Sequence, residues 1–129
     1  MPEHIELGKR GELLAIEYLE SKGYKILEIN WRTNRKEIDI IAIDNNEIVF
    51  IEVKTRRKNY YEDPEEAVNI KKQKYLINAA EDYIFSNKID LEARFDIISV
   101  ISDGNKHNID HIKENPCKSS NTSKLSDRP

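Results

Sequence analysis

The chain lacks the features that mark a secreted or membrane-spanning protein. Its 129 residues contain one cysteine, Cys117, so no intramolecular disulfide can form, as is usual in a reducing compartment. No apolar run approaches the roughly 20 residues of a membrane-spanning helix. The first residues, MPEHIELGKRGE, have neither the basic start nor the apolar stretch of a secretory signal. We therefore expect a cytoplasmic protein that does not associate with membranes.

The chain also lacks an excess of positive charge. It has 21 Lys and Arg residues against 24 Asp and Glu residues, and residues 1–112 alone carry 17 basic against 22 acidic residues, a net charge of −5. Nucleic-acid-binding surfaces usually show clustered Lys and Arg, so the overall charge does not indicate one. A local basic cluster occupies residues 54–58, KTRRK, and a solvated surface run is its simplest interpretation.

Length and composition predict a single domain followed by a tail. A chain of 129 residues suits one hydrophobic core, which we assign to residues 1–112. Residues 113–129, KENPCKSSNTSKLSDRP, contain two prolines and four serines and almost nothing apolar. We expect this tail to be disordered, because it cannot bury enough apolar surface to offset the entropy of ordering.

The apolar pattern predicts an α/β fold with a mixed sheet flanked by helices, in the order α-β-β-β-α-β-β. Apolar residues recur at helical spacing before Gly23 and again after a helix-start signal at Pro64. β-branched and aromatic residues dominate the segments between and after them. A strand, a long helix and a further strand favour a right-handed crossover between parallel strands. The expected helices span residues 7–21 and 64–87, and the expected strands span residues 24–32, 37–43, 47–53, 93–101 and 109–112.

The turn between the second and third strands sets the register of a hairpin. Asn45 and Asn46 tolerate the positive φ angles that a two-residue turn needs at both central positions. With that turn, Asp39 faces Glu52, and their Cβ atoms would lie roughly 4.5–5.5 Å apart, where two carboxylates repel. A divalent cation would relieve this repulsion, because Mg²⁺ binds one or two carboxylates and completes its shell with water and phosphate oxygens. The hairpin therefore predicts a site for Mg²⁺ or Mn²⁺.

Lys54 and Glu12 are candidates for the same site as Asp39 and Glu52. Lys54 lies two residues after Glu52 and so projects from the same face of its strand. Glu12 lies at the edge of the apolar stripe of the first helix, where it either points along the sheet toward the carboxylates or faces solvent. A metal ion beside an ammonium group suits phosphodiester hydrolysis, because the metal polarises the phosphoryl oxygen and the lysine orients the attacking water. A surface ion pair is the alternative interpretation of Glu-x-Lys.

The motifs at these positions resemble a known family. The similarity covers residues 5–102 and rests on GKRGELLAIEYLESKGYKILEINWR, EIDIIA, FIEVKTR, PEEAV and RFDIISV, which look like the YraN-like family of small uncharacterised bacterial proteins. That family is similar to archaeal Holliday junction resolvases, in the restriction-endonuclease-like superfamily. The superfamily signature is an Asp followed by Glu-x-Lys, often with a glutamate on the first helix. The resemblance implies that Asp39 and Glu52 bind metal, that Lys54 is the catalytic lysine, that Glu12 is the helix glutamate, and that two copies pair as a homodimer.

Other residues are weaker candidates. Asp96 either approaches the site or serves as an ion-pair partner at the end of the sheet. His107, His111 and Cys117 contain zinc-ligand atoms, but their spacing in a strand and loop gives them no common helix face, so we do not expect a zinc site. The candidate contacts to nucleic-acid phosphates are Arg32, Arg56, Arg57, Lys71 and Lys74, although a solvated helical face equally accounts for the lysines.

Two functional hypotheses follow from the sequence. The first is a divalent-metal-dependent endonuclease-like enzyme that hydrolyses phosphodiester bonds in DNA, with branched or structured DNA as the expected substrate. The second is a non-catalytic module on a nuclease fold that binds nucleic acid or another protein, which the acidic balance favours. A purely structural ion-pair cluster is a third interpretation. Metal-dependent turnover separates the first hypothesis from the other two.

Overall fold

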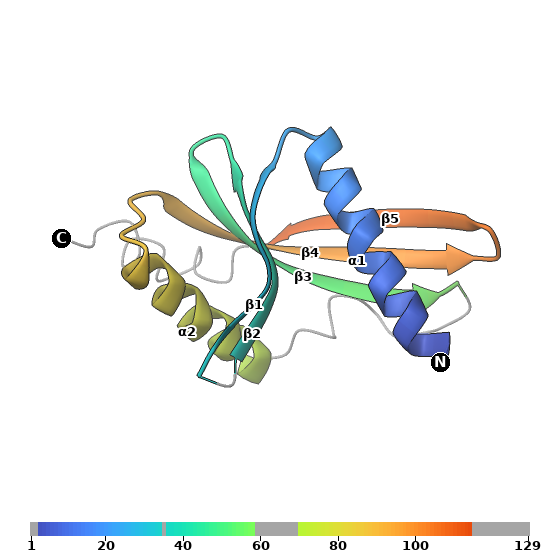
Figure 1. Ribbon diagram of the computed structural model, residues 1–129, viewed down its shortest axis with the longest axis horizontal. Helices are drawn as coiled ribbons and strands as arrows, with labels where there is room; N and C mark the ends of the chain where they lie inside the picture. Colours follow the sequence, from blue (N-terminus) through green and yellow to red (C-terminus); the bar gives the residue numbers. More distant parts are fainter. Residues whose placement is uncertain (1–2, 35, 59–69, 115–129) are drawn as a thin grey trace.

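The computed structural model contains a five-stranded sheet with a helix on each face (Figure 1). It describes residues 3–34, 36–58 and 70–114. The predicted order of helices and strands is confirmed. The elements are α1 (Glu3–Ser21), β1 (Lys25–Thr33), β2 (Lys36–Asp44), β3 (Glu47–Arg57), α2 (Ile70–Ser86), β4 (Glu92–Asp103) and β5 (Lys106–Glu114).

The strands lie in the sheet in chain order, β1-β2-β3-β4-β5. β3 and β4 are parallel, and every other neighbouring pair is antiparallel. The parallel pair confirms the predicted crossover, because parallel neighbours need a long connection and α2 lies within it. The sheet is therefore mixed, as predicted.

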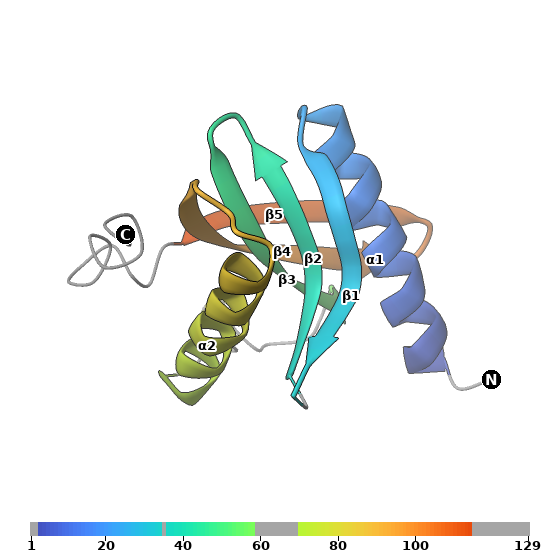
Figure 2. The same cartoon turned by 60° about the vertical axis from the view of Figure 1, so that its left-hand side comes forward.

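The two faces of the sheet have separate cores, and Figure 2 shows the helices on opposite sides. On the face covered by α1, which we call the α1 side, Ala15 and Leu19 are fully buried against strand residues that include Ile40 and Ile51. Their spacing of four residues puts both on one stripe of the helix, which explains its orientation. On the other face, the α2 side, the core is larger and is formed mainly by Ile38, Ile41, Ile48, Phe50, Leu76, Ala79, Tyr83, Phe95 and Ile97.

The first helix ends where the sequence predicts. Gly23 has a positive φ of 91°, and its N–H donates to the carbonyl of Glu20 at 3.0 Å. The N–H of Tyr24 donates to the carbonyl of Leu19 at 3.0 Å. These bonds satisfy carbonyls of the last helical turn, and glycine is the residue that adopts this left-handed conformation at low cost. The chain then turns directly into β1.

Several predicted boundaries differ from the structure. α1 begins at Glu3 rather than at residue 7, and β3 continues to Arg57 because it stays paired with β4 along its whole length. β5 spans Lys106–Glu114, so the first two residues of the predicted tail belong to the sheet. Its sequence is mostly polar because it is an edge strand, which is why the apolar pattern predicts only residues 109–112. The predicted helix start at residue 64 and residues 115–129 lie outside the described residues.

Candidate active site

The predicted β2–β3 register is confirmed up to the point where the strands separate. Their paired residues run from Asp44↔Glu47 to Ile40↔Ile51. Only Asn45 in the turn has a positive φ, 56°, so the prediction of two left-handed residues is wrong, although the register is unaffected. The pairing stops one position before Asp39 and Glu52. These two residues therefore lie where β2 leaves β3, instead of facing each other as a regular cross-strand pair.

The Asp39 carboxylate reaches sideways to β3. Its Oδ2 accepts the backbone N–H of Val53 at 2.8 Å. A continued ladder would have paired that N–H with a β2 carbonyl. The carboxylate thus closes the end of the ladder, and one of its oxygens is held in place while β2 and β3 diverge.

A local irregularity explains this sideways position. Ile38 packs on the α2 side and Ile40 on the α1 side, although residues two apart in a regular strand share a face. Asn30 of β1, between the pairs Ile29↔Ile40 and Trp31↔Ile38, has a left-handed φ of 53°. The strand pair therefore switches faces at Asn30 and Asp39, and Asp39 is left near the plane of the sheet. Strict alternation of side chains along β2 would not give this position.

Glu52 and Lys54 follow regular alternation on β3. Ile51 and Val53 pack on the α1 side, whereas Phe50 packs on the α2 side, so Glu52 and Lys54 project from the α2 side. The Glu52 side chain is buried, with the residue 8% exposed. Lys54 is half-buried, and within residues 3–34, 36–58 and 70–114 its ammonium group makes no hydrogen bond or ion pair. A carboxylate and an uncommitted cation thus share one face.

Glu12 approaches the site from the opposite side of the sheet. Gly11 lies directly over Thr55 of β3, and a Cβ atom at position 11 would come within 2.0 Å of the Thr55 Oγ1. The absence of a side chain therefore lets α1 approach β3 closely. This contact places Glu12 near Asn30, whose side chain hydrogen bonds to it. Asp39 lies between acids contributed from both faces.

The electrostatics of this region are those of crowded acids. Burial, then the negative charge of Glu52, raises the pKa of Asp39 from 3.8 to about 7; the Val53 N–H opposes this rise, and Glu12 and Glu37 add to it. Burial and the charge of Glu37 likewise raise the pKa of Glu12, against the hydrogen bond from Asn30. Without a nearby cation, the charged carboxylate form of Asp39 or Glu12 is therefore disfavoured in this environment.

The donor set fits a hard divalent cation. Within the described segments, no three His, Cys, Asp or Glu side chains converge as a complete ligand set. Mg²⁺ does not need one, because it keeps several waters and uses one or two carboxylates together with substrate phosphates. Asp39 and Glu52 supply two such carboxylates, and the raised pKa of Asp39 is the expected sign of a carboxylate that a cation would stabilise. The residues that would hold the ion are therefore these two.

Comparison with known proteins gives the family. The model of Uncharacterised protein family UPF0102 matches residues 11–100. The chain belongs to this family. A UPF0102 protein of Bacteroides thetaiotaomicron is 49% identical over 114 residues, which cover 88% of this chain and 94% of that protein. A UPF0102 protein of Thermodesulfovibrio yellowstonii is 51% identical over 109 residues, covering 84% and 94%.

The family assignment confirms the resemblance drawn from the motifs, since UPF0102 is the YraN family of the restriction-endonuclease-like group. Among solved structures, that of SSO0001 aligns at 16% identity with a TM-score of 0.33, and the alignment covers 94% of this chain and 56% of SSO0001. A likeness of this size carries no functional information. In the part of the UPF0102 chain that the structure describes, neither helix is long and apolar enough to cross a membrane.

The basic residues predicted to contact phosphates have different environments. Arg32 is exposed and lies 3.8 Å from Glu37, and Arg57 of β3 and Lys74 of α2 are also exposed. Arg56 is buried, with 9% of the residue exposed, and it already has an interaction partner. Lys71 lies in α2, but its side chain is outside the described residues. The three exposed residues are the ones a ligand can reach directly.

Asp96 belongs to a separate polar network, as an ion-pair partner. It is 1% exposed on the α1 side, where its carboxylate accepts from Arg94 Nε at 2.8 Å and lies 2.6 Å from His111 Nε2. Arg94 also contacts Asp44 at 3.0 Å and Glu47 at 2.8 Å. Burial alone would raise the pKa of Asp96, but the hydrogen bonds from His111 and Arg94 lower it. This network was not predicted from the sequence, in which the only signal for it was Arg94 two residues before Asp96.

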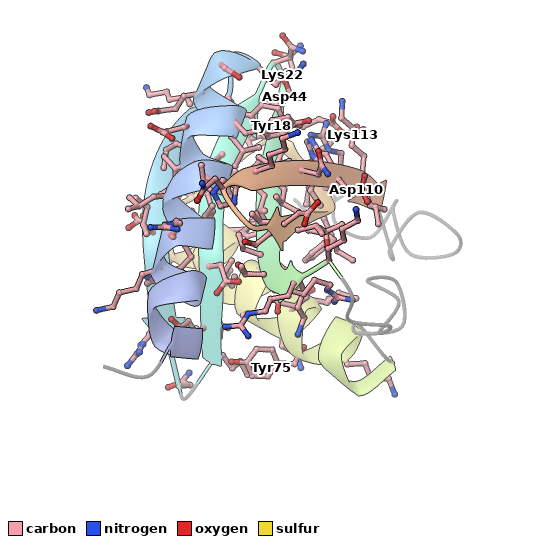
Figure 3. The ribbon with its side chains drawn as sticks, turned by 90° about the vertical axis from the view of Figure 1, so that its right-hand side faces the viewer. Tyr18, Lys22, Asp44, Tyr75, Asp110 and Lys113 are labelled. Atoms are coloured by element: carbon pink, nitrogen blue, oxygen red, sulfur yellow. The ribbon has the colours of Figure 1, made fainter. Side chains whose placement is uncertain are left out.

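The network and the candidate active site lie apart. Figure 3 shows Tyr18 and Asp44, which border the network, at one end of the molecule, and Tyr75 at the other end. The Tyr75 hydroxyl accepts the N–H of Glu37, and Glu37 acts electrostatically on Asp39. His111 is bound to Asp96 and to Tyr18 Oη at 3.1 Å. This histidine is thus committed to the network.

One buried hydroxyl is left without a partner beside Lys54. Ser99 of β4 is the lateral neighbour of Lys54 in the parallel β3–β4 pair and lies on the same face. It is fully buried, and among the residues the structure describes its Oγ has no hydrogen-bond partner. A buried polar atom of this kind costs stability. It is a second polar group on this face that the fold itself does not satisfy.

Proposed function

We propose that this protein is a divalent-metal-dependent nuclease that hydrolyses phosphodiester bonds in DNA, with branched or structured DNA as its substrate. The observation that carries the proposal is the Asp39 carboxylate, held at the β2–β3 divergence with a pKa raised to about 7 by burial and neighbouring acids. Structural ion pairs do the opposite, because they lower the pKa of a carboxylate. A perturbed acid of this kind is typical of a functional site, and the neighbouring strand carries Lys54 two residues after Glu52.

The residues have distinct roles in this reaction. Asp39 and Glu52 would hold Mg²⁺ or Mn²⁺, and when bound the ion would polarise the phosphoryl oxygen and lower the pKa of a coordinated water. The Lys54 ammonium, on the same face as Glu52, orients the attacking water and stabilises the charge that develops on the phosphate. Glu12 accepts from waters on the α1 side, where Asn30 keeps its carboxylate in place.

Cleavage by matched variants tests the proposal. Purified protein would be incubated with duplex and four-way-junction DNA in Mn²⁺, Mg²⁺ or EDTA. Cleavage should require the divalent ion and should fall by at least about 100-fold in both Glu52→Gln and Lys54→Ala. Lys106→Ala, an exposed lysine at the start of β5, is the matched control and should cut like the parent. Equal cleavage by parent and Glu52→Gln protein would assign the activity to a contaminant.

A non-catalytic module on the same fold is the second candidate. The net charge of −5 over residues 1–112 favours it, as does the lack, within the described segments, of a third acid that would complete a protein-only metal site. This candidate predicts salt-sensitive nucleic-acid binding without product under any divalent ion. Release of cut strands by the parent, lost in Glu52→Gln, would eliminate it.

A further inference from the structure

A polar hollow lies beside the candidate active site. It has a volume of about 420 Å³ and opens between the β1–β2 hairpin and α2. This volume is within the range of small-ligand sites. Among the described residues, it is lined by Arg32, Thr33, Asn34, Lys36, Glu37 and Tyr75. Five of these six side chains can donate hydrogen bonds, and only Glu37 is acidic.

Most of these donors are uncommitted. The Tyr75 hydroxyl accepts the N–H of Glu37, which leaves its own proton free to donate outward. Arg32 is 77% exposed in its side chain and faces Glu37 only at 3.8 Å, longer than a hydrogen bond. Among the residues the structure describes, Asn34 and Lys36 have no hydrogen-bond or ion-pair partner. The hollow therefore presents donors and positive charge to a ligand.

Glu37 connects the hollow to the active site. It lines the hollow, and it lies on β2, the strand that also carries Asp39. Glu37 and Asp39 are two residues apart on β2, a separation of roughly 6.6 Å along a strand. A ligand that reaches both the hollow and Asp39 is therefore extended, and the cations Arg32 and Lys36 favour an anionic group in the hollow.

We propose that this hollow binds a phosphate group of the substrate strand next to the phosphate that is cleaved at Asp39. The inference rests on the proposed function and adds to it a substrate class, a nucleic-acid strand whose backbone is held at two consecutive positions. Lys36 and Arg32 neutralise the phosphate, and Tyr75 and Asn34 donate hydrogen bonds to its oxygens. The Arg32–Glu37 contact is loose enough for the guanidinium to turn to the ligand.

Binding without cleavage provides the test. Fluorescence anisotropy would measure the affinity of a short fluorescein-labelled oligothymidylate in EDTA, where the proposed reaction cannot occur. Lys36→Ala should weaken binding by about 3- to 10-fold and reduce the slope of log affinity against log salt by about 0.7, the value for one lost single-strand phosphate contact. Lys106→Ala, which removes the same charge at the far β4–β5 turn, should change affinity by less than about 2-fold. Equal losses in the two variants would overturn the proposal.

Tyr75→Phe gives an independent readout. It keeps the ring and removes the hydroxyl, so the loss of affinity should be about 3-fold. Amide NMR of ¹⁵N-labelled protein titrated with the dinucleotide pTpT should shift the signals of Thr33, Asn34 and Lys36, and shifts elsewhere without these would refute the site. Binding at the hollow by a protein that never cuts DNA would refute only the proposed function. Cleavage that is unchanged in Lys36→Ala would refute only the hollow.

Discussion

Replacing Asp39 by asparagine should stabilise the metal-free protein. The side chains have the same shape, and the amide oxygen can still accept the Val53 N–H that Asp39 accepts at 2.8 Å. The substitution removes the charge that burial and the neighbouring acids disfavour. A pKa raised from 3.8 to about 7 corresponds to at most about 4 kcal/mol of unfolding free energy. Water and local relaxation around this half-buried group screen much of it, so we expect about 1–2 kcal/mol.

The pH dependence of this effect has a definite sign. Below pH 4, Asp39 is protonated in both the folded and the unfolded chain, and its charge costs nothing. As the pH rises from about 4 to 7, the unfolded chain ionises first, so the parent loses stability relative to Asp39→Asn. Above about pH 7 both states are ionised, and the difference between the two proteins is constant.

Thermal unfolding of both proteins from pH 4 to 9 is the assay. In EDTA at pH 8, Asp39→Asn should melt about 4–8 °C above the parent. Excess Mn²⁺ should raise the melting temperature of the parent and leave the variant unchanged, because bound metal stabilises the folded state by mass action. Asp90→Asn, at an exposed aspartate before β4, is the control and should show neither effect. A less stable Asp39→Asn protein at pH 8 would refute the reasoning about crowded acids.

Three further substitutions test the surroundings of the site. Arg94→Ala should destabilise by about 3–5 kcal/mol in urea unfolding, because it removes the arginine that is paired with the buried Asp96 and leaves that carboxylate with His111 and Tyr24; a loss below 1 kcal/mol would contradict this. Gly11→Ala should reduce the free energy of unfolding by about 1–3 kcal/mol, since its Cβ would lie 2.0 Å from Thr55 Oγ1. Adding Thr55→Ser should recover little of this stability, because serine lacks only the methyl group and keeps the clashing Oγ. Ser99→Ala should raise stability by about 1 kcal/mol, because the buried Oγ has no hydrogen-bond partner in the described part of the chain; a lower melting temperature would show that the hydroxyl is bonded in solution.

The order of helices and strands follows from the sequence because the patterns that predict each element lie within that element. The helical spacing before Gly23 and the β-branched runs of β2 and β3 each act within a few residues, and they predicted the order of elements. β5 was found only in part, because an edge strand needs few apolar residues. The turn at Asn45 and Asn46 predicted the register of β2 against β3 correctly, although only Asn45 has the predicted positive φ.

The detailed geometry of the site does not follow from the sequence, because β2 breaks the regular alternation of side chains between the two faces of the sheet at Asp39. Regular pairing places Asp39 opposite Glu52, whereas the left-handed Asn30 on a neighbouring strand turns Asp39 into the sheet plane. No pattern within β2 signals this. Glu37 was overlooked for a similar reason, since its influence on Asp39 arises only after the strands diverge.

The acidic balance of the chain is weaker evidence against nucleic-acid binding than the charge count suggests. Three acids, Asp44, Glu47 and Asp96, share one cation, Arg94, in a network away from the candidate site, so part of the net negative charge of the chain lies there and not at the site. At the site itself, a divalent ion would offset the charges of Asp39 and Glu52 and leave the uncommitted cations to act on a phosphate. Metal and nucleic acid would then strengthen each other's binding by the same factor, since coupling between two ligands is reciprocal. Nucleic-acid affinity that rises with Mn²⁺ is thus the behaviour that an acidic nuclease of this design must have.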